Sequence, residues 1–330
     1  MRRLINDPYE VVEEMLSGYV KAHKDQVKLL DHDGRVLVKK DLVKDKVGVI
    51  IGGGSGHEPL FLGYVGENFA DAAVIGNINT SPSPEPCYNA VKAVDQGKGC
   101  IYLYGNYAGD VMNFDMGAEM AADDGIRVET VLITDDVVSS DNIEDRRGIA
   151  GDLLVMKVAG AAAAKGLDLD EVVRLSKKCN DNTRSMGVAL SSSTIPVKGG
   201  PIFEMEDGDM EIGMGIHGEP GVRRGKIEPA NQVVDEIMEF IFKDFEIKEG
   251  EEVYTLVNGL GGLPLMDQYI INNHLEEVLT KKGIKIHKAL VGNYATSMDM
   301  IGMGITICKV DDELKELLDY KVDTPYMMIK

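Results

Sequence analysis

VGVIIGGGSGHEP, residues 47–59, joins an apolar run to a glycine-rich turn. The β-branched residues before Gly52 predict a buried strand of a parallel sheet. Glycines follow, and they let the backbone turn tightly and approach a ligand because they have no Cβ. His57 and Glu58 come next, and Pro59 ends the turn. Ligands of open α/β sheets bind at the carboxyl ends of the strands, so this turn is a candidate site.

The sequence around this turn alternates between strand and helix patterns. Apolar runs at 72–75, 100–104 and 128–134 predict further strands, and the ranges near 85–96 and 112–124 have helical spacing. Strands separated by helices of this length are typical of βαβ units in a mostly parallel sheet. The predicted fold class is therefore α/β.

A change of character near residue 185 predicts a domain boundary. Two helices are expected at 152–165 and 169–186, whereas the segments beyond them are short and flanked by Gly, Pro and Asp. A chain of 330 residues can form two domains that each bury a core. We expect α/β domains at 1–185 and 186–330, each with a mixed, largely parallel sheet flanked by helices.

The second half of the sequence repeats the pattern of an apolar run, a glycine turn and a proline. A predicted strand at 252–257 runs into a glycine turn that ends at Pro264, and a helix at 265–279 and a strand at 285–291 follow. The tetrapeptide GNYA also occurs twice after an apolar run, at 105–108 and 292–295. This echo has two interpretations: a duplicated α/β half, or two similar strand ends.

The composition excludes several classes of partner. A formal net charge of −20 argues against nucleic acid and against an anionic membrane surface. It suits an uncharged small molecule or a protein with a basic patch. The four cysteines are far apart without metal-type spacing, and no signal peptide or transmembrane segment is recognisable. We therefore expect a cytoplasmic protein that binds no metal.

Polar side chains gather in a few loops that follow predicted strands. Besides the glycine turn, these loops are TSPSP at 80–84, GNYAGD at 105–110 and GMGIHGEP at 213–220. Structural explanations exist, because Asp110 could simply cap a helix and Ser-Pro pairs usually make turns. His57 and His217 are different, since both lie among glycines where packing gives no reason for an imidazole. Structural roles are expected for the other histidines: His23, His32, His274 and His287.

A cluster of His57, Asp110 and His217 supports two kinds of chemistry. Imidazole is suited to proton transfer because its pKa lies near neutrality. It can also attack a carbonyl carbon and form a covalent adduct. Metal binding lacks the usual ligand spacing, and neither a P-loop nor a dinucleotide fingerprint is present. The chain is therefore not expected to bind ATP itself.

Several motifs together resemble the substrate-binding subunit of dihydroxyacetone kinases. The resemblance covers the whole chain in order and continues to LVGNYATSMD at 290–299. The motifs are GGGSGHEP at 52–59, TSPSP at 80–84, NYAGDVMNF at 106–114, RRGIAG at 146–151 and GIHGEPG at 215–221.

The resemblance implies a site and a reaction in glycerone and glycerol metabolism. His217 is expected to bind a short-chain ketose as a hemiaminal. His57 and Asp110 are expected to act on the hydroxyl that receives the phosphoryl group. The residues that the resemblance places around the ketose are Gly54, Ser55, Ser81 and Gly105.

The resemblance also implies partners. We expect the phosphoryl group to come from a separate helical subunit that holds the nucleotide with Mg²⁺. That subunit either uses ATP or carries ADP that a phosphotransferase-system protein recharges. This chain is expected to bind no cofactor and to form a homodimer.

Two departures from the family pattern leave alternatives. Gly105 stands where the family usually has a lysine, and the segment 137–145 is shorter than usual. One alternative is a kinase subunit for a tetrulose such as erythrulose. Another is a ketose-binding sensor or co-activator that does not phosphorylate. His57 and Asp110 favour the enzyme, because a sensor needs no general base.

Overall fold

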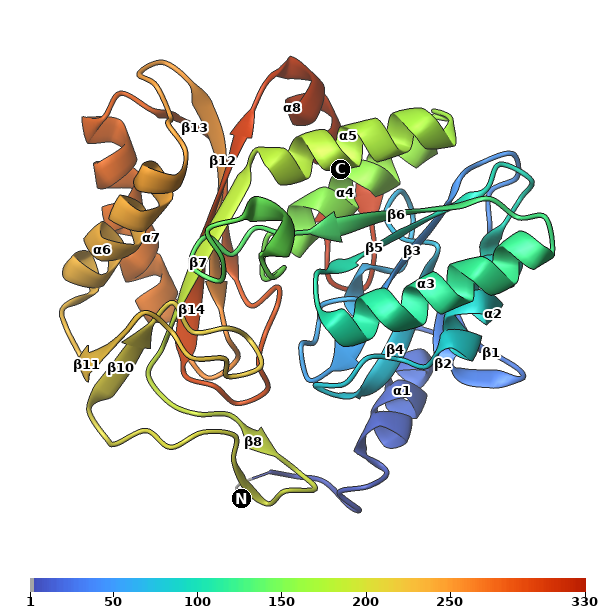
Figure 1. Cartoon of the computed structure of the whole chain (residues 1–330), viewed down its shortest axis with the longest axis horizontal. Coiled ribbons are helices and arrows are strands. Elements are labelled where there is room, and N and C mark those ends of the chain that lie inside the picture. Colours follow the sequence, from blue (N-terminus) through green and yellow to red (C-terminus); the bar gives the residue numbers. More distant parts are fainter. Residues whose placement is uncertain (1–2) are drawn as a thin grey trace. The chain divides into compact units, whose positions relative to one another are not determined.

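The computed structural model describes residues 3–330 and contains two compact units (Figure 1). The second unit, as we name it, comprises Thr134–Gly151 and Asn180–Lys315. The first unit comprises the described residues up to Ile133, together with Asp152–Cys179 and Glu316–Lys330. Within the described residues, no helix has the length and apolar composition needed to cross a bilayer.

The first unit is built on a mixed six-stranded sheet. Strand β3 is parallel to β4 and β5, and β5 is parallel to β6. All eight residues of β3 are buried, as expected for a central parallel strand. The strand order is β1 (Val27–Leu30), β2 (Asp33–Lys39), β4 (Ala72–Ile78), β3 (Gly48–Ser55), β5 (Cys100–Gly105) and β6 (Val128–Ile133).

Helices flank this sheet, and two of them carry predicted site motifs at their start. These helices, α2 and α3, pack against each other, and α4 contacts β3 and β5. Helix α2 begins at Pro84, whose missing N–H costs nothing in the first turn. The helices that begin in this unit are α1 (Val11–Ala22), α2 (Pro84–Val94), α3 (Ala108–Asp123), α4 (Asp152–Ala164), α5 (Leu169–Asp181) and the one-turn η1 (Leu62–Tyr64).

The core between this sheet and its helices holds α3 in place. Phe114 of α3 is fully buried, and its ring stacks on Tyr104 of β5 with the centroids 4.3 Å apart. Tyr102 meets the same phenylalanine edge-on at 4.9 Å. Such aromatic pairs add to the free energy that burial alone supplies. The start of α3 is thereby fixed at the carboxyl edge of the sheet.

The second unit contains another six-stranded sheet, with more antiparallel pairing than expected. Strands β12 and β13 are parallel and are joined by helix α7. The other strand pairs of this sheet are antiparallel. Parallel neighbours need a crossover, whereas short loops return the chain in the opposite direction. The order is β11 (Arg223–Lys226), β10 (Asp209–Ile212), β7 (Thr183–Ala189), β14 (Gly302–Val310), β12 (Glu252–Gly259) and β13 (Lys285–Gly292).

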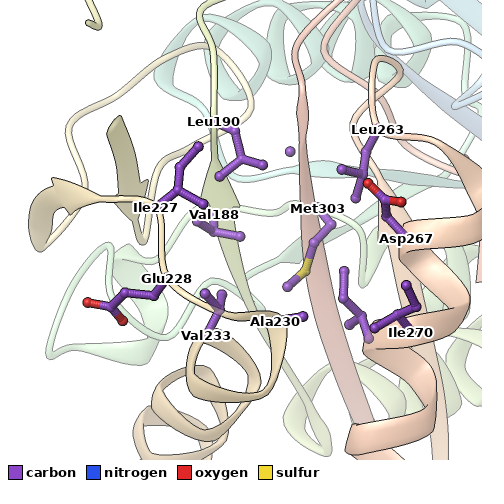
Figure 2. A pocket seen from close by; sticks show the side chains of 12 residues that line it. Val188, Leu190, Ile227, Glu228, Ala230, Val233, Leu263, Asp267, Ile270 and Met303 are labelled. Atoms are coloured by element: carbon purple, nitrogen blue, oxygen red, sulfur yellow. The ribbon is translucent and has the colours of Figure 1, made fainter. Parts of the chain in front are cut away.

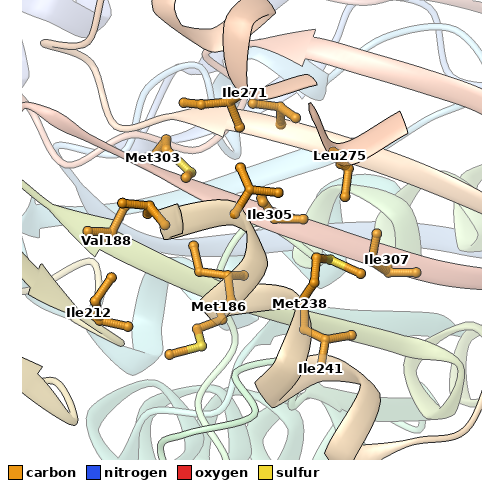
Figure 3. Close-up of a cluster of buried hydrophobic side chains, with 14 of the residues drawn as sticks. Met186, Val188, Ile212, Met238, Ile241, Ile271, Leu275, Met303, Ile305 and Ile307 are labelled. Atoms are coloured by element: carbon orange, nitrogen blue, oxygen red, sulfur yellow. The ribbon is translucent and has the colours of Figure 1, made fainter. Parts of the chain in front are cut away.

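Helices α6 (Ala230–Asp244) and α7 (Leu265–Lys281) bury their apolar faces against this sheet (Figure 3). The side chains packed in this core include Met186, Val188, Met238, Ile241, Ile271, Leu275, Ile305 and Ile307.

The remaining elements of the chain are short. They are η2 (Ile143–Asp145), α8 (Asp312–Leu318) and the strands β8 (Thr194–Ile195), β9 (Gly200–Pro201), β15 (Val322–Asp323) and β16 (Met328–Ile329).

Two sheets flanked by helices confirm the predicted α/β class. The compact units interleave along the chain, whereas a single boundary near residue 185 was predicted. The segment 134–151 belongs to the second unit because its backbone pairs with β7: Ser185 N–H donates to the carbonyl of Asp135 at 2.7 Å. Helix α4 returns to the first sheet, and local sequence patterns do not report such long-range pairing.

Candidate functional site

Strand β3 continues through Gly52–Ser55, further than predicted, so the chain turns only from Gly56 on, at the carboxyl end of the strand. A Cβ at Gly54 would lie 2.8 Å from the backbone nitrogen of Thr80, so glycine is needed for the loop after β4 to come this close. The hydroxyl of Ser55 donates to the carbonyl of Gly76 at 2.7 Å. Two of the predicted ketose-site residues therefore join the ends of neighbouring parallel strands.

His57 is 2% exposed and lies in the turn that leaves β3. Its carbonyl accepts a hydrogen bond from the N–H of Leu60 at 3.0 Å. The next residue, Glu58, turns its carboxylate back to the N–H of Gly56, at 3.1 Å from each oxygen. Burial raises the pKa of Glu58, and the Gly56 N–H opposes that rise. The turn that carries His57 is thus held by its own backbone and side-chain contacts.

Asp110 lies in the first turn of α3 and is 9% exposed. The residue that caps this helix is Tyr107, so the N-cap explanation for Asp110 is wrong. The helix begins at Ala108, a few residues earlier than the apolar spacing indicated. A carboxylate in this turn is favoured by the helix dipole and is positioned by the strand that precedes it.

Ser81 lies against the start of the same helix. Its Oγ accepts a hydrogen bond from Nδ2 of Asn113 at 3.1 Å and donates to the carbonyl of Pro82 at 3.1 Å. A Cβ at Gly109 would lie 3.4 Å from the Cβ of Ser81. Gly105 is buried at the end of β5. Its carbonyl accepts from the N–H of Tyr107 at 2.8 Å.

His217 lies in the loop between β10 and β11, and its side chain is 23% exposed. Oε1 of Glu219 lies 3.2 Å from Nδ1 of the ring, and Oε2 accepts the backbone N–H of His217 at 3.1 Å. Burial acts to raise the pKa of Glu219, but the hydrogen bond and charge of His217 and the charge of Arg147 lower it to about 2. An ionised carboxylate at Nδ1 favours the Nδ1–H tautomer, in which Nε2 carries the lone pair.

The predicted residues therefore fall into two groups. The first unit holds Gly54, Ser55, His57, Ser81, Gly105 and Asp110 at the ends of its strands, and the second unit holds His217 with Glu219. No role was predicted for Glu219, Arg147 or Asn113, although all three lie inside the sequence motifs that carry the resemblance. A carboxylate two residues after a histidine in a glycine loop was the available signal for Glu219.

An apolar pocket of about 160 Å³ lies elsewhere in the second unit (Figure 2). It is formed by β7 and β14 with the starts of α6 and α7, through residues such as Val188, Met303, Val233 and Ile270. The residues that line it include none of the predicted site residues. Across residues 3–330, no three His, Cys, Asp or Glu side chains are grouped to hold a metal ion.

Comparison with known proteins gives a consistent set of relatives. A family model described as the Dak1 domain matches residues 17–326. The chain is 67% identical over 330 residues to the PTS-dependent dihydroxyacetone kinase 2, dihydroxyacetone-binding subunit DhaK, of Listeria innocua, and the match covers 100% of both.

Solved structures agree in fold. The dihydroxyacetone kinase of C. freundii matches with a TM-score of 0.92 and 32% identity, over 99% of this chain and 60% of that chain. A second structure of that kinase is a complex with AMP-PNP and Mg²⁺. The dihydroxyacetone kinase operon co-activator Dha-DhaQ matches with a TM-score of 0.89 and 31% identity, over 96% and 98% of the two chains.

Proposed function

The chain belongs to the Dak1 domain family, and on this premise we propose that it is the ketose-binding subunit of a dihydroxyacetone kinase. This membership confirms the resemblance that the sequence motifs indicated. The subunit binds dihydroxyacetone and presents a terminal hydroxyl, and a partner subunit supplies the phosphoryl group. The contact between His217 and Glu219 is the observation that carries the binding chemistry.

Binding is covalent and begins at Nε2 of His217. The Nε2 lone pair attacks the ketone carbon, a C–N bond forms as the C=O π bond opens, and the oxygen takes a proton from water. The ring keeps its Nδ1–H and carries the positive charge, which the Glu219 carboxylate balances at 3.2 Å. Glycerol has no carbonyl and cannot form this bond, so selectivity arises from bond formation rather than from pocket shape.

Phosphoryl transfer then needs a base at the terminal hydroxyl. His57 or Asp110 accepts the hydroxyl proton as the phosphoryl group arrives. Asp110 is supported in this role by its place in the first turn of α3, next to the Ser81 loop. An anchored ketose is also oriented, which lowers the entropic cost of the transfer.

The nucleotide and Mg²⁺ belong to the partner subunit in this proposal. The relative from Listeria innocua is named PTS-dependent, which supports a phosphotransferase-system protein as the donor that recharges the partner's ADP. We place the subunit in the cytoplasm as a homodimer. A reducing compartment suits the buried thiols Cys87, Cys100, Cys179 and Cys308.

Intact-protein mass spectrometry in saturating dihydroxyacetone tests the covalent step. We expect a mass increment of one ketose in the unaltered chain and none in His217→Ala. His274→Ala is the matched control, because both ring nitrogens of His274 face carboxylates, at 2.9 Å from Asp235 and 3.1 Å from Glu277. An unmodified chain at saturation, or an adduct that survives in His217→Ala, contradicts the proposal.

A second candidate function is a ketose-binding co-activator. The match to Dha-DhaQ and the glycine at position 105 favour it. His57 and Asp110 favour the kinase subunit, and Gly105 also keeps a tetrulose substrate in consideration. Mixing the chain with a nucleotide-carrying subunit, a donor and either dihydroxyacetone or erythrulose separates these functions. Sugar phosphate indicates the kinase and its substrate, whereas adduct without turnover indicates the co-activator.

A further inference from the structure

The RRGIAG motif at 146–151 supplies no group to the proposed covalent step or to the phosphoryl transfer. Its two arginines make different contacts. Nη1 of Arg146 donates to Oδ2 of Asp244 at 2.9 Å, a contact that holds the loop to the end of α6. Arg147 instead lies near the ketose-binding loop, where its guanidinium meets two carboxylates.

Asp136 fixes one edge of the Arg147 guanidinium. Nε and Nη2 of Arg147 donate to Oδ2 of Asp136 at 3.1 and 2.8 Å, and the Asp136 side chain is 2% exposed. The backbone of Arg147 is held as well, because its N–H donates to Oγ of Ser139 at 3.0 Å. Burial raises the pKa of Asp136 to about 6, although the charge of Arg147 opposes the rise. Asp136 and Ser139 therefore fix the position of Arg147 independently of its contact with Glu219.

The other edge of the guanidinium faces Glu219. Nη1 of Arg147 lies 3.7 Å from Oε2 of Glu219, the oxygen that also accepts the backbone N–H of His217. Oε1 is thereby turned toward Nδ1 of the ring. The two carboxylate oxygens have separate partners, which sets the rotation of the carboxylate.

Gly215 leaves the space for this ion pair. A Cβ at position 215 would lie 2.2 Å from Oε2 of Glu219 and 2.8 Å from Nη1 of Arg147. Its φ is in the range that alanine adopts, since it lies outside the positive-φ glycines. An alanine here would displace two flexible side-chain ends and leave the backbone unstrained.

We infer that Arg147 is a positioning residue for His217: it orients the Glu219 carboxylate, which holds the ring with Nδ1–H toward it and Nε2 ready to attack. The inference rests on the proposed function, because it assigns the orientation of the histidine that the adduct requires. It gives the second arginine of the motif a role in ketose binding that is separate from the structural role of the first.

The test compares variants of the full-length chain. Arg147→Ala removes the guanidinium, Arg147→Lys keeps the charge without the planar fork, and Gly215→Ala displaces the ion pair. Arg223→Ala is a matched control, because Arg223 pairs with Glu236 and Glu228 in the same unit. Gly200→Ala is a second control, since a Cβ there meets nothing within 4 Å.

Two readouts distinguish positioning from folding. The first is the dihydroxyacetone concentration at half-maximal adduct, followed by mass spectrometry between pH 6 and 9. We expect it to rise roughly tenfold in Arg147→Ala and Gly215→Ala, as for the loss of a charged contact, with an intermediate value in Arg147→Lys and no change in the controls. The second is the tautomer of His217 by ¹⁵N NMR without ketose, in which these variants should lose Nδ1–H population.

Wild-type tautomer and wild-type adduct affinity in both Arg147→Ala and Gly215→Ala would overturn the inference. If Arg147→Ala fails to fold, as judged by circular dichroism, Gly215→Ala decides. Failure of the proposed function has a different signature, because the unaltered chain would then form no adduct while the ketose-free NMR readout still reports on Arg147.

Discussion

Nδ2 of Asn113 donates a hydrogen bond to Oγ of Ser81 at 3.1 Å, and this contact ties α3 to the loop after β4. The two residues come from different motifs, 32 positions apart. The tie holds the Ser81 hydroxyl beside the helical turn that carries Asp110. The loop at 80–84 and the start of α3 therefore form one arrangement, in which Asn113 supports Ser81, a proposed ketose-site residue.

Replacing Asn113 with alanine should weaken ketose binding. The lost bond is between neutral groups and contributes about 1 kcal/mol, so the concentration for half-maximal adduct should rise about fivefold. Asn273→Ala is the control, because Asn273 makes an exposed contact with Glu277. Unchanged binding in Asn113→Ala would show that the tie does not position Ser81.

Loss of the proposed bases should slow transfer without preventing binding. In His57→Ala and Asp110→Ala we expect kcat for sugar phosphate to fall by about 10²–10⁴, the usual effect of removing an acid–base group. The adduct on His217 should persist in both variants. Asp115→Ala, an exposed acidic position on the same helix, should retain activity. Normal turnover in either base variant contradicts its assigned role.

Asp244 should contribute strongly to the stability of the second unit. It pairs with Arg146 and Arg184, whose side chains are only 4% and 6% exposed. Asp244→Asn removes the charge that both guanidinium groups share, and we expect a loss of about 3 kcal/mol in the free energy of unfolding at pH 7. Urea unfolding measures this loss, and a change below 1 kcal/mol would contradict it.

The ion pairs of Asp244 also predict that the free energy of unfolding depends on pH. Burial acts to raise the pKa of Asp244, but hydrogen bonds and charges from Arg146 and Arg184 outweigh it, so the folded-state pKa is lowered. A carboxylate with a lowered pKa in the folded state stabilises the fold at pH values above its unfolded-state pKa of about 3.9. This stabilisation is lost as the pH falls through the folded-state pKa. The stability difference between the wild type and Asp244→Asn should therefore be constant near neutrality and shrink below about pH 4.

Gly52 should be intolerant of any side chain. A Cβ there would lie 2.6 Å from the backbone oxygen of Val74 and 2.8 Å from the Phe114 ring. Gly52→Ala must therefore separate β3 from β4 or displace α3, and we expect a lowered Tm and weaker ketose binding. Gly18→Ala is the control: it lies exposed in α1 with nothing near its Cβ, and should stabilise by about 0.5–1 kcal/mol. Equal melting of the two variants would contradict the prediction.

Local signals in the sequence were sufficient for the parallel centre of the first sheet and for the loops at its edge. The run before Gly52 became the first half of the fully buried β3, which continues through the glycines predicted to turn, and 80–84 became the loop that leads into α2. The start of α3 was missed because Ala108 and Gly109 carry no apolar periodicity. Packing of Phe114 on Tyr104 accompanies the earlier start.

Local sequence patterns did not predict the direction of the strands in the second unit or which strands pair with each other. The apolar pattern of β14 is the same for either direction, and its antiparallel pairing with β12 and β7 joins segments that are far apart in the sequence. Likewise, nothing local links Arg147 to Glu219, 72 positions later, since charges on loops pair with whatever the fold brings near.

The amino-acid sequence alone determined the α/β class, the family and the identity of the imidazoles and carboxylates proposed for the chemistry. These properties depend on short-range patterns: apolar runs, glycine turns and motif residues next to one another. Tertiary structure decided which segments of the chain make up each compact unit. It also decided that Glu219 contacts the ring of His217 and that Arg147 lies next to Glu219. Those outcomes follow from contacts between distant segments, whose free energy depends on geometry that exists only after the chain has folded.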